Sequence, residues 1–186
     1  ASFGNPVDFS YACSGDGETF RPTGFSDADA ATLCDPEGAK ASNLFGFVLN
    51  RNPARLHVIQ MNPESSDAPG VIDTDGFIPG FSGIPLADAP LKLLRSDDWS
   101  SVYVLSSGGQ SLQRMVVHGV DARKVLDYTL SPPVTLPGRP SDGLIIADTL
   151  WVASANQPVV WAFSIGPDGA LTAGGERTLP GRIHTM

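Results

Sequence analysis

Histidines are the first side chains of this sequence that could bind a metal or move a proton. There are three, His57, His118 and His184, and none has a second histidine, a cysteine or a paired carboxylate at the spacing of a familiar zinc site. His57 lies in an alternating, strand-like run and His118 stands just before a glycine, so we expect structural roles for both. The surroundings of the histidines therefore do not predict a zinc site.

Acidic turns offer oxygen ligands instead. The segment Asp73-Thr74-Asp75-Gly76 resembles the opening of a calcium-binding loop, but the later ligands of such a loop and its closing glutamate are missing. Acidic turns are ordinarily just solvated. We keep Asp73 and Asp75 as candidate ligands for calcium or another divalent cation, and predict no cofactor.

Catalytic motifs are missing from the sequence. No serine stands in Gly-x-Ser-x-Gly with a histidine and carboxylate to activate it, and no glycine-rich loop is followed by the lysine that phosphate binding needs. Large aromatic side chains are better placed for binding or packing. Trp99 lies in a turn beside Asp97 and Asp98, which makes these three residues the predicted binding rim, while Trp151 and Trp161 suit packing between repeats.

Two cysteines, Cys13 and Cys34, share one segment rich in Gly, Asp and Ser, and neither belongs to a Cys-x-x-Cys motif. A disulfide between them would close a loop of about 22 residues, which the chain-entropy model values at roughly 3 kcal/mol. A polar, turn-rich segment gains most from such a link. We predict this disulfide and hence an extracytoplasmic protein, periplasmic, secreted or at the cell surface; the alternative is two unrelated thiols in a cytosolic protein.

The composition indicates an all-β chain. Its 186 residues include 20 Gly and 16 Pro without a Gly-X-Y period, which implies many turns and few helices beyond three turns. The formal charge is −8, from 12 basic and 20 acidic residues, and no Lys/Arg cluster occurs, so nucleic acid is not an expected partner. No apolar stretch approaches the roughly 18 residues of a membrane span, so no transmembrane segment is predicted.

An internal repeat would position these side chains. Thr135–Arg139 reads Thr-Leu-Pro-Gly-Arg and returns unchanged as Thr178–Arg182, and Pro90 and Pro140 each begin an apolar run. A period of about 40 to 50 residues, with short apolar runs and Pro/Gly turns, suits one propeller blade of four antiparallel strands. We expect Phe77–Gly80 to take the place of the same linker in an earlier copy. The alternative is a small β-sandwich in which the repeats are strand pairs.

Two stretches carry a family resemblance. Pro90–Val117 and Pro140–Gly169 share the order proline, apolar strand, Asp-containing turn, Val-Tyr-Val or Leu-Trp-Val, polar turn and apolar strand, and Leu44–Met61 is a weaker copy. This order resembles the YVTN/lactonase-like β-propellers. The resemblance implies four-stranded blades that form an incomplete portion of a larger, about seven-bladed ring. It also implies that His184 begins an inner strand facing the central channel, where histidines of some such propellers bind metal or substrate, so His184 is a candidate metal ligand.

The predicted organisation follows from the repeat. Residues 1–42 form a disulfide-stapled N-terminal extension or an irregular first blade, and blade repeats follow at about 43–86, 87–139 and 140–182, with the next starting at 183. The predicted function is a non-catalytic exported scaffold, which binds through loops or the channel mouth and is completed by a protein partner or by the remainder of its own propeller. The alternative that the resemblance implies is part of a lactonase-like hydrolase or redox propeller, with a metal or electron-carrier site in the channel.

Overall fold

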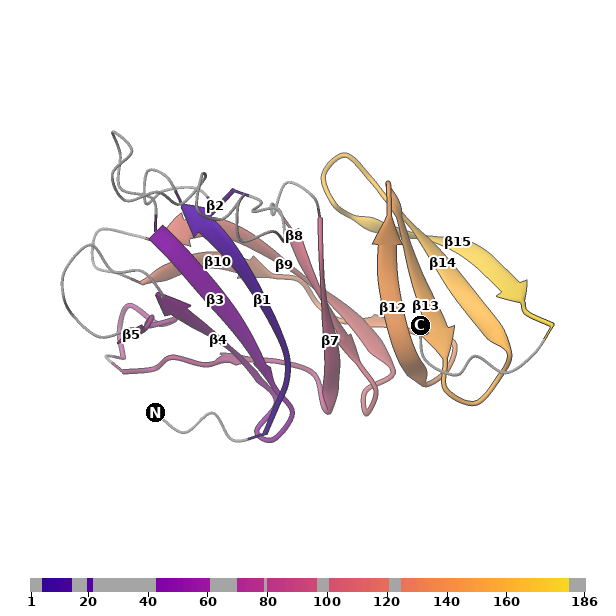
Figure 1. The fold of residues 1–186 in the computed structure, drawn as a ribbon, viewed down its shortest axis with the longest axis horizontal. Helices are drawn as coiled ribbons and strands as arrows, with labels where there is room; N and C mark the ends of the chain where they lie inside the picture. The colour runs from indigo at the N-terminus through magenta and orange to yellow at the C-terminus, as the bar shows by residue number, and fades with distance from the viewer. Residues whose placement is uncertain are drawn as a thin grey trace.

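The chain is all-β in the computed structural model. The structure describes residues 5–14, 20–21, 43–60, 70–78, 80–96, 101–120 and 125–180. This described part contains fifteen strands and no helix, and every pairing between the named strands is antiparallel. No helix in it could cross a membrane. The predicted fold class is confirmed: the strands form three separate sheets, compatible with propeller blades, and no closed ring forms among the described residues (Figure 1).

The sheets follow one another along the chain. The first contains β1 (Pro6–Ser14), β2 (Phe20–Arg21), β3 (Asn43–Asn50), β4 (Arg55–Gln60), β5 (Gly70–Val71) and β6 (Ile84–Pro85). The second contains β7 (Pro90–Arg95), β8 (Ser101–Ser106), β9 (Ser111–Val120), β10 (Leu126–Leu130) and β11 (Val134–Thr135). The third contains β12 (Pro140–Ile146), β13 (Thr149–Ser154), β14 (Val159–Ile165) and β15 (Leu171–Thr178). Their orders are β2-β1-β3-β4-β5 with β6 on β4, β10-β9-β8-β7 with β11 on β9, and β12-β13-β14-β15.

One strand pattern recurs in all three sheets. The strands β1, β7 and β12 begin at Pro6, Pro90 and Pro140, and each has a bulge directly after its proline. Proline lacks a backbone donor, so it is tolerated at a strand start and next to a bulge. The strand β1, from the segment predicted as an extension or irregular first blade, thus pairs with β3 and takes the same place as β7 and β12.

The repeated linker has one structural role in each sheet. The amide of Leu136 donates to the carbonyl of Gln110, which ends the β8–β9 turn, at 2.7 Å. The amide of Leu179 donates to the carbonyl of Pro158, which ends the β13–β14 turn, also at 2.7 Å. In the first sheet, the amide of Leu86 donates the corresponding hydrogen bond to the carbonyl of Ala54, which ends the β3–β4 turn, at 3.1 Å. The prediction that residues 77–80 fill this place is therefore wrong. Phe77 lies in the β5–β6 connection, where its side chain is 97% exposed.

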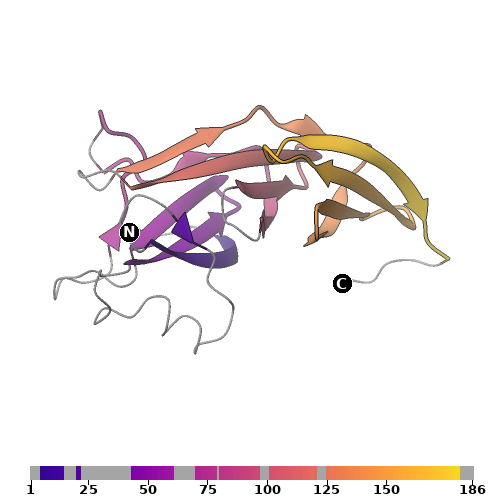
Figure 2. The ribbon, with the colours of Figure 1, turned by 90° about the horizontal axis from the view of Figure 1, so that it is seen from above.

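The second sheet lies between the first and the third (Figure 2). A hydrophobic core packs on each of its two faces. Side chains alternate across a strand, so Val102 and Val104 of β8 enter the core shared with the first sheet, while Tyr103 and Leu105 enter the core shared with the third. All six residues of β8 are buried. Trp161 is buried in the second of these cores, which confirms its predicted role in packing between repeats.

Candidate functional site

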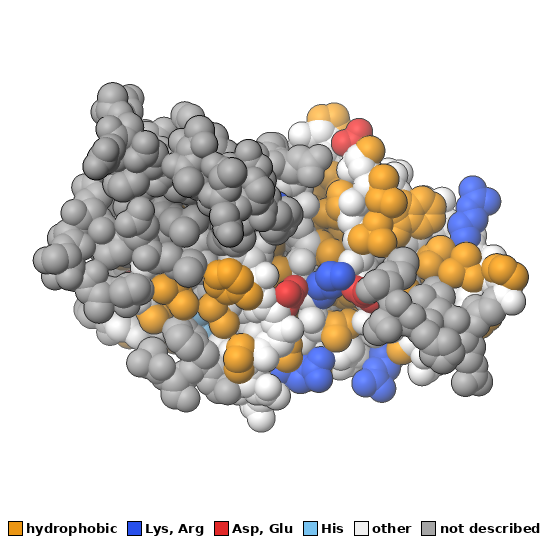
Figure 3. Space-filling model, in the orientation of Figure 1, with side chains coloured by type: hydrophobic (Ala, Val, Ile, Leu, Met, Phe, Trp, Pro, Cys, Tyr) orange, Lys and Arg blue, Asp and Glu red, His pale blue; other side chains and the backbone are white. Residues whose placement is uncertain are grey.

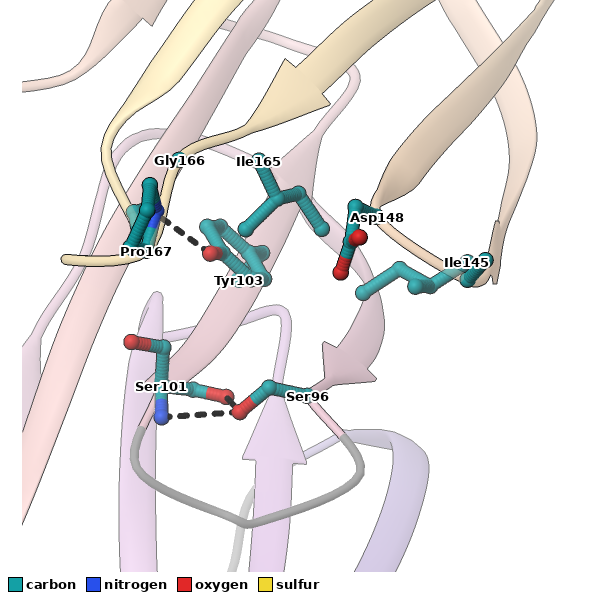
Figure 4. A pocket seen from close by; sticks show the side chains of 10 residues that line it. Ser96, Ser101, Tyr103, Ile145, Asp148, Ile165, Gly166 and Pro167 are labelled. Carbon is teal, nitrogen blue, oxygen red and sulfur yellow. Dashed lines mark hydrogen bonds between the residues drawn. The ribbon is translucent and has the colours of Figure 1, made fainter.

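A pocket of about 250 Å³ lies between the second and third sheets, where the ends of β7 and β8 meet the β12–β13 and β14–β15 hairpins. Its walls carry two serines and a tyrosine from the second sheet and two isoleucines and an aspartate from the third: Ser96, Ser101, Tyr103, Ile145, Ile165 and Asp148. In Figure 4 the third-sheet side chains face the tyrosine across this space. The pocket is therefore a product of sheet stacking, since neither sheet forms it alone.

Hydrogen bonds across the junction hold the walls in place. The hydroxyl of Tyr103, which is 0% exposed, donates to the carbonyl of Gly169 in the β14–β15 hairpin at 2.8 Å. The guanidinium of Arg114 donates to the carbonyl of Asp168, and its Nε donates to Ser101 Oγ at 3.1 Å. The second sheet thus fixes the position of the hairpin that closes the pocket.

The ends of β7 and β8 are tied to each other. Ser96 Oγ accepts from the amide of Ser101 and donates to its carbonyl, each at 3.0 Å. Figure 4 shows both serines at the pocket wall. They flank the segment 97–100, so the predicted rim residues Trp99, Asp97 and Asp98 lie outside the described residues, and their binding role stays a prediction.

Asp148 gives the pocket its charge. Its backbone carbonyl accepts from the amide of Ile165 at 2.7 Å, which anchors the β12–β13 turn on β14. Figure 4 shows its carboxylate directed toward the pocket beside Ile145 and Ile165. Asp148 is exposed, so its carboxylate is accessible to a ligand donor.

The predicted cation ligands Asp73 and Asp75 make turn hydrogen bonds. Asp73 Oδ2 accepts from the amide of Gly80 at 3.0 Å, and Asp75 Oδ1 accepts from the amide of Phe77 at 2.8 Å. Aspartates commonly bond nearby backbone in this way. Over the described ranges, no group of three or more His, Cys, Asp or Glu side chains could hold a metal, and His184 lies outside those ranges.

The other two histidines have structural surroundings. His118 Nε2 lies 3.0 Å from Thr129 Oγ1 on the neighbouring strand β10. Burial lowers the pKa of His57, the charge of Arg55 adds to this, and a hydrogen bond with the backbone of Ser82 opposes it. These contacts agree with the roles expected from the sequence.

The predicted disulfide has one end in a described strand. The backbone of Cys13 lies in β1, where it pairs with Leu44 of β3 and Arg21 of β2. Cys34 lies outside the described residues. The Cys13–Cys34 disulfide therefore stays a prediction.

A row of charged side chains was not foreseen from the sequence. Asp8, Lys92 and Asp142 each stand two positions after the first proline of their sheet. Asp8 Oδ2 accepts from the amide of Leu93 at 2.7 Å, and Lys92 Nζ contacts Asp142 Oδ1 at 2.6 Å. Figure 3 shows acidic and basic side chains next to one another near the middle of the molecular face that it draws. Their shared spacing after a proline was the signal that could have revealed these links between successive sheets.

Comparison of the sequence with protein-family models and with curated proteins finds no match. The resemblance to YVTN/lactonase-like propellers therefore rests on the repeat pattern alone.

Proposed function

We propose that this chain is a non-catalytic, exported scaffold of propeller-type blades, and that it holds a basic side chain of a partner protein in the pocket between its second and third sheets. The observation that carries the proposal is the Asp148 carboxylate, directed into a pocket whose neighbouring walls are Ile145 and Ile165. A lysine or arginine side chain matches this arrangement, because its apolar stem packs on isoleucine while its charged end meets the carboxylate.

The size of the pocket supports a side chain over a free small molecule. Pockets for drug-sized ligands usually enclose about 300 to 1,000 Å³, whereas this one encloses about 250 Å³. The net charge of −8 also favours encounter with a basic partner. The non-catalytic part of the proposal is supported by the sequence, which contains no nucleophile motif.

An NMR titration with N-acetyl-lysine amide tests the pocket, with N-acetyl-norleucine amide as the uncharged comparison. We expect the lysine derivative to shift the amide signals of Asp148 and Ile165, and expect Asp148→Asn to abolish these shifts. Asp127→Asn is the matched control, because it removes one carboxylate from an exposed position on β10. Equal shifts from both compounds, or shifts that survive Asp148→Asn, would contradict the proposal.

Extracytoplasmic location depends on the predicted disulfide and has its own test. Native protein is alkylated without reduction and its intact mass is measured. A linked Cys13–Cys34 pair takes up no reagent until a reductant is added, whereas two added alkyl groups without reductant would contradict this part of the proposal.

A further inference from the structure

Two polar side chains of β9 are buried with an atom that no protein group bonds. Ser111 is 4% exposed and Gln113 is 7% exposed. Over the described residues, neither Ser111 Oγ nor Gln113 Oε1 has a hydrogen-bond partner. The other end of the Gln113 amide is satisfied, because its Nε2 donates to the carbonyl of Ser131 at 3.1 Å. Buried polar atoms normally have a partner from the protein or from ordered water, so these two atoms point to a bound molecule.

Both side chains face the junction between the first and second sheets. Leu112 stands between them in the sequence and belongs to the core shared with the third sheet, so alternation directs Ser111 and Gln113 to the opposite side of β9. Met115 follows on that side and belongs to the core shared with the first sheet. The two unpartnered atoms therefore share one side of an otherwise apolar core.

A third polar group lies beside them. Ser106 pairs with Ser111 across β8 and β9 and is 0% exposed. Its hydroxyl donates to the carbonyl of Ala87 at 3.5 Å, longer than the roughly 2.5 to 3.0 Å usual for a hydroxyl donor. A Cβ added to Gly109 would lie 3.2 Å from Ser111 Oγ and 3.6 Å from the Cβ of Ala87, so the Ser111 hydroxyl lies close to the same linker. Ser106, Ser111 and Gln113 together offer the three or so partners that a buried water usually has.

The corresponding positions of the third sheet are apolar. The pairings β8–β9 and β13–β14 share one register, which aligns Ser111 with Val159. Gln113 aligns with Trp161, whose buried ring lies against Gly138 of the linker. A glutamine side chain is smaller than this ring and has a polar end. The junction of the first and second sheets is therefore suited to water at the place where the next junction is filled by an aromatic ring.

We infer that Ser106, Ser111 and Gln113 bind an ordered water molecule, buried between the first and second sheets. The water accepts the hydroxyl hydrogen of Ser111 and donates its own two hydrogens to Gln113 Oε1 and Ser106 Oγ. None of the three side chains is charged, so a neutral molecule matches the site better than an ion, which would need a compensating charge. The inference goes beyond the proposed function, because the pocket lies at the other junction.

A crystal structure of the full chain at atomic resolution tests the inference. We expect a water peak about 2.5 to 3.0 Å from both Ser111 Oγ and Gln113 Oε1. The absence of such a peak, or a protein group bonded to each of the two atoms in its place, would overturn the inference.

A double variant tests the same site in solution. Ser111→Val and Gln113→Leu together replace both ligands with apolar side chains, as in the third sheet. Oxygen-17 relaxation dispersion of the solvent counts long-lived buried waters, and this count should fall by one in the double variant. Ser164→Val removes an exposed hydroxyl from β14 and should leave the count unchanged. A double variant with the wild-type count contradicts the inference, and the wild-type crystal structure decides it if the double variant does not fold.

Discussion

Equivalent residues in the three sheets have different chemistry at one strand position. His57, Gln113 and Trp161 occupy the same register on β4, β9 and β14. Gln113 and Trp161 are buried, whereas His57 is partly buried. A titratable side chain at this position makes the stability of the first sheet depend on pH.

The pH dependence has a definite sign. Because the pKa of His57 is lowered below its ordinary value of 6.5 in the folded protein, the unfolded chain takes up the proton first as pH falls. The free energy of unfolding should therefore decrease as pH falls from 6.5 toward the folded-state pKa, and then level off. His57→Gln, which installs the side chain found at Gln113, should remove this slope. Urea unfolding at several pH values measures it, and a slope unchanged by the substitution would show that another group is responsible.

Tyr103 connects the two sheets that form the pocket. Tyr103→Phe removes the hydroxyl that bonds the carbonyl of Gly169, and should cost about 1 to 3 kcal/mol because a buried acceptor loses its donor. Chemical denaturation measures the loss. Tyr128→Phe on the half-buried β10 position is the control and should cost less. Similar losses of unfolding free energy for both variants would mean that the hydrogen bond from Tyr103 to Gly169 does not contribute to stability beyond an ordinary tyrosine hydroxyl.

At the scale of elements, the repeated Thr-Leu-Pro-Gly-Arg segment contributes to the core between sheets. Leu136 is buried in the core that joins the second and third sheets. A Cβ on Gly138 would lie 3.1 Å from Cη2 and 3.2 Å from Cζ2 of the Trp161 ring. The linker therefore needs a small residue where it crosses the tryptophan.

Gly138→Ala should consequently destabilise the protein. The buried ring of Trp161 has to shift, and overpacking of this kind typically costs about 1 to 3 kcal/mol. Thermal unfolding and Trp fluorescence measure the loss and the ring displacement together. Gly70→Ala is the control, since nothing lies within 4 Å of the added Cβ there and it should have little effect. Equal destabilisation by the two substitutions would contradict this account of the linker.

Much of the element structure could be predicted from the sequence because it depends on local signals. Proline and glycine spacing predicted strands, turns and the repeat from Pro90 onward. The predicted position of the first linker was wrong because Phe77-Ile78-Pro79-Gly80 resembles the Thr-Leu-Pro-Gly sequence locally. The hydrogen bond that marks the true position joins Leu86 to the carbonyl of Ala54, in a turn far away along the chain. Pairing of β1 with β3 joins segments separated by residues 15–42, and no local pattern reports such pairing.

The candidate site was less predictable for a similar reason. The pocket needs Tyr103 and Asp148 from different sheets, and only the packing of those sheets brings them together. The predicted rim residues 97–99 stand between Ser96 and Ser101 in the sequence but lie outside the described residues, so their binding role stays a prediction. Conversely, Asp73 and Asp75 looked like cation ligands because turn aspartates and loop ligands share the same residue type.

At the scale of the whole molecule, the second sheet carries both cores. Its β8 strand is buried along its full length, whereas β15 is exposed from Thr172 to Thr178. Amide hydrogen exchange should therefore be slowest in β8 and fast in β15, because exchange follows local opening. Mass spectrometry of peptides covering the two strands measures this difference. Equal protection would indicate that the three sheets unfold as one unit.

The exposed strand β15 also limits how molecules of this kind assemble. Gly174 is an extra residue opposite β14, Gly175 has a φ of 111°, and the charged residues Glu176 and Arg177 follow. A bulged, charged border discourages another strand from pairing with it. Edge-to-edge pairing through β15, the contact through which amyloid-like sheets extend, is therefore disfavoured.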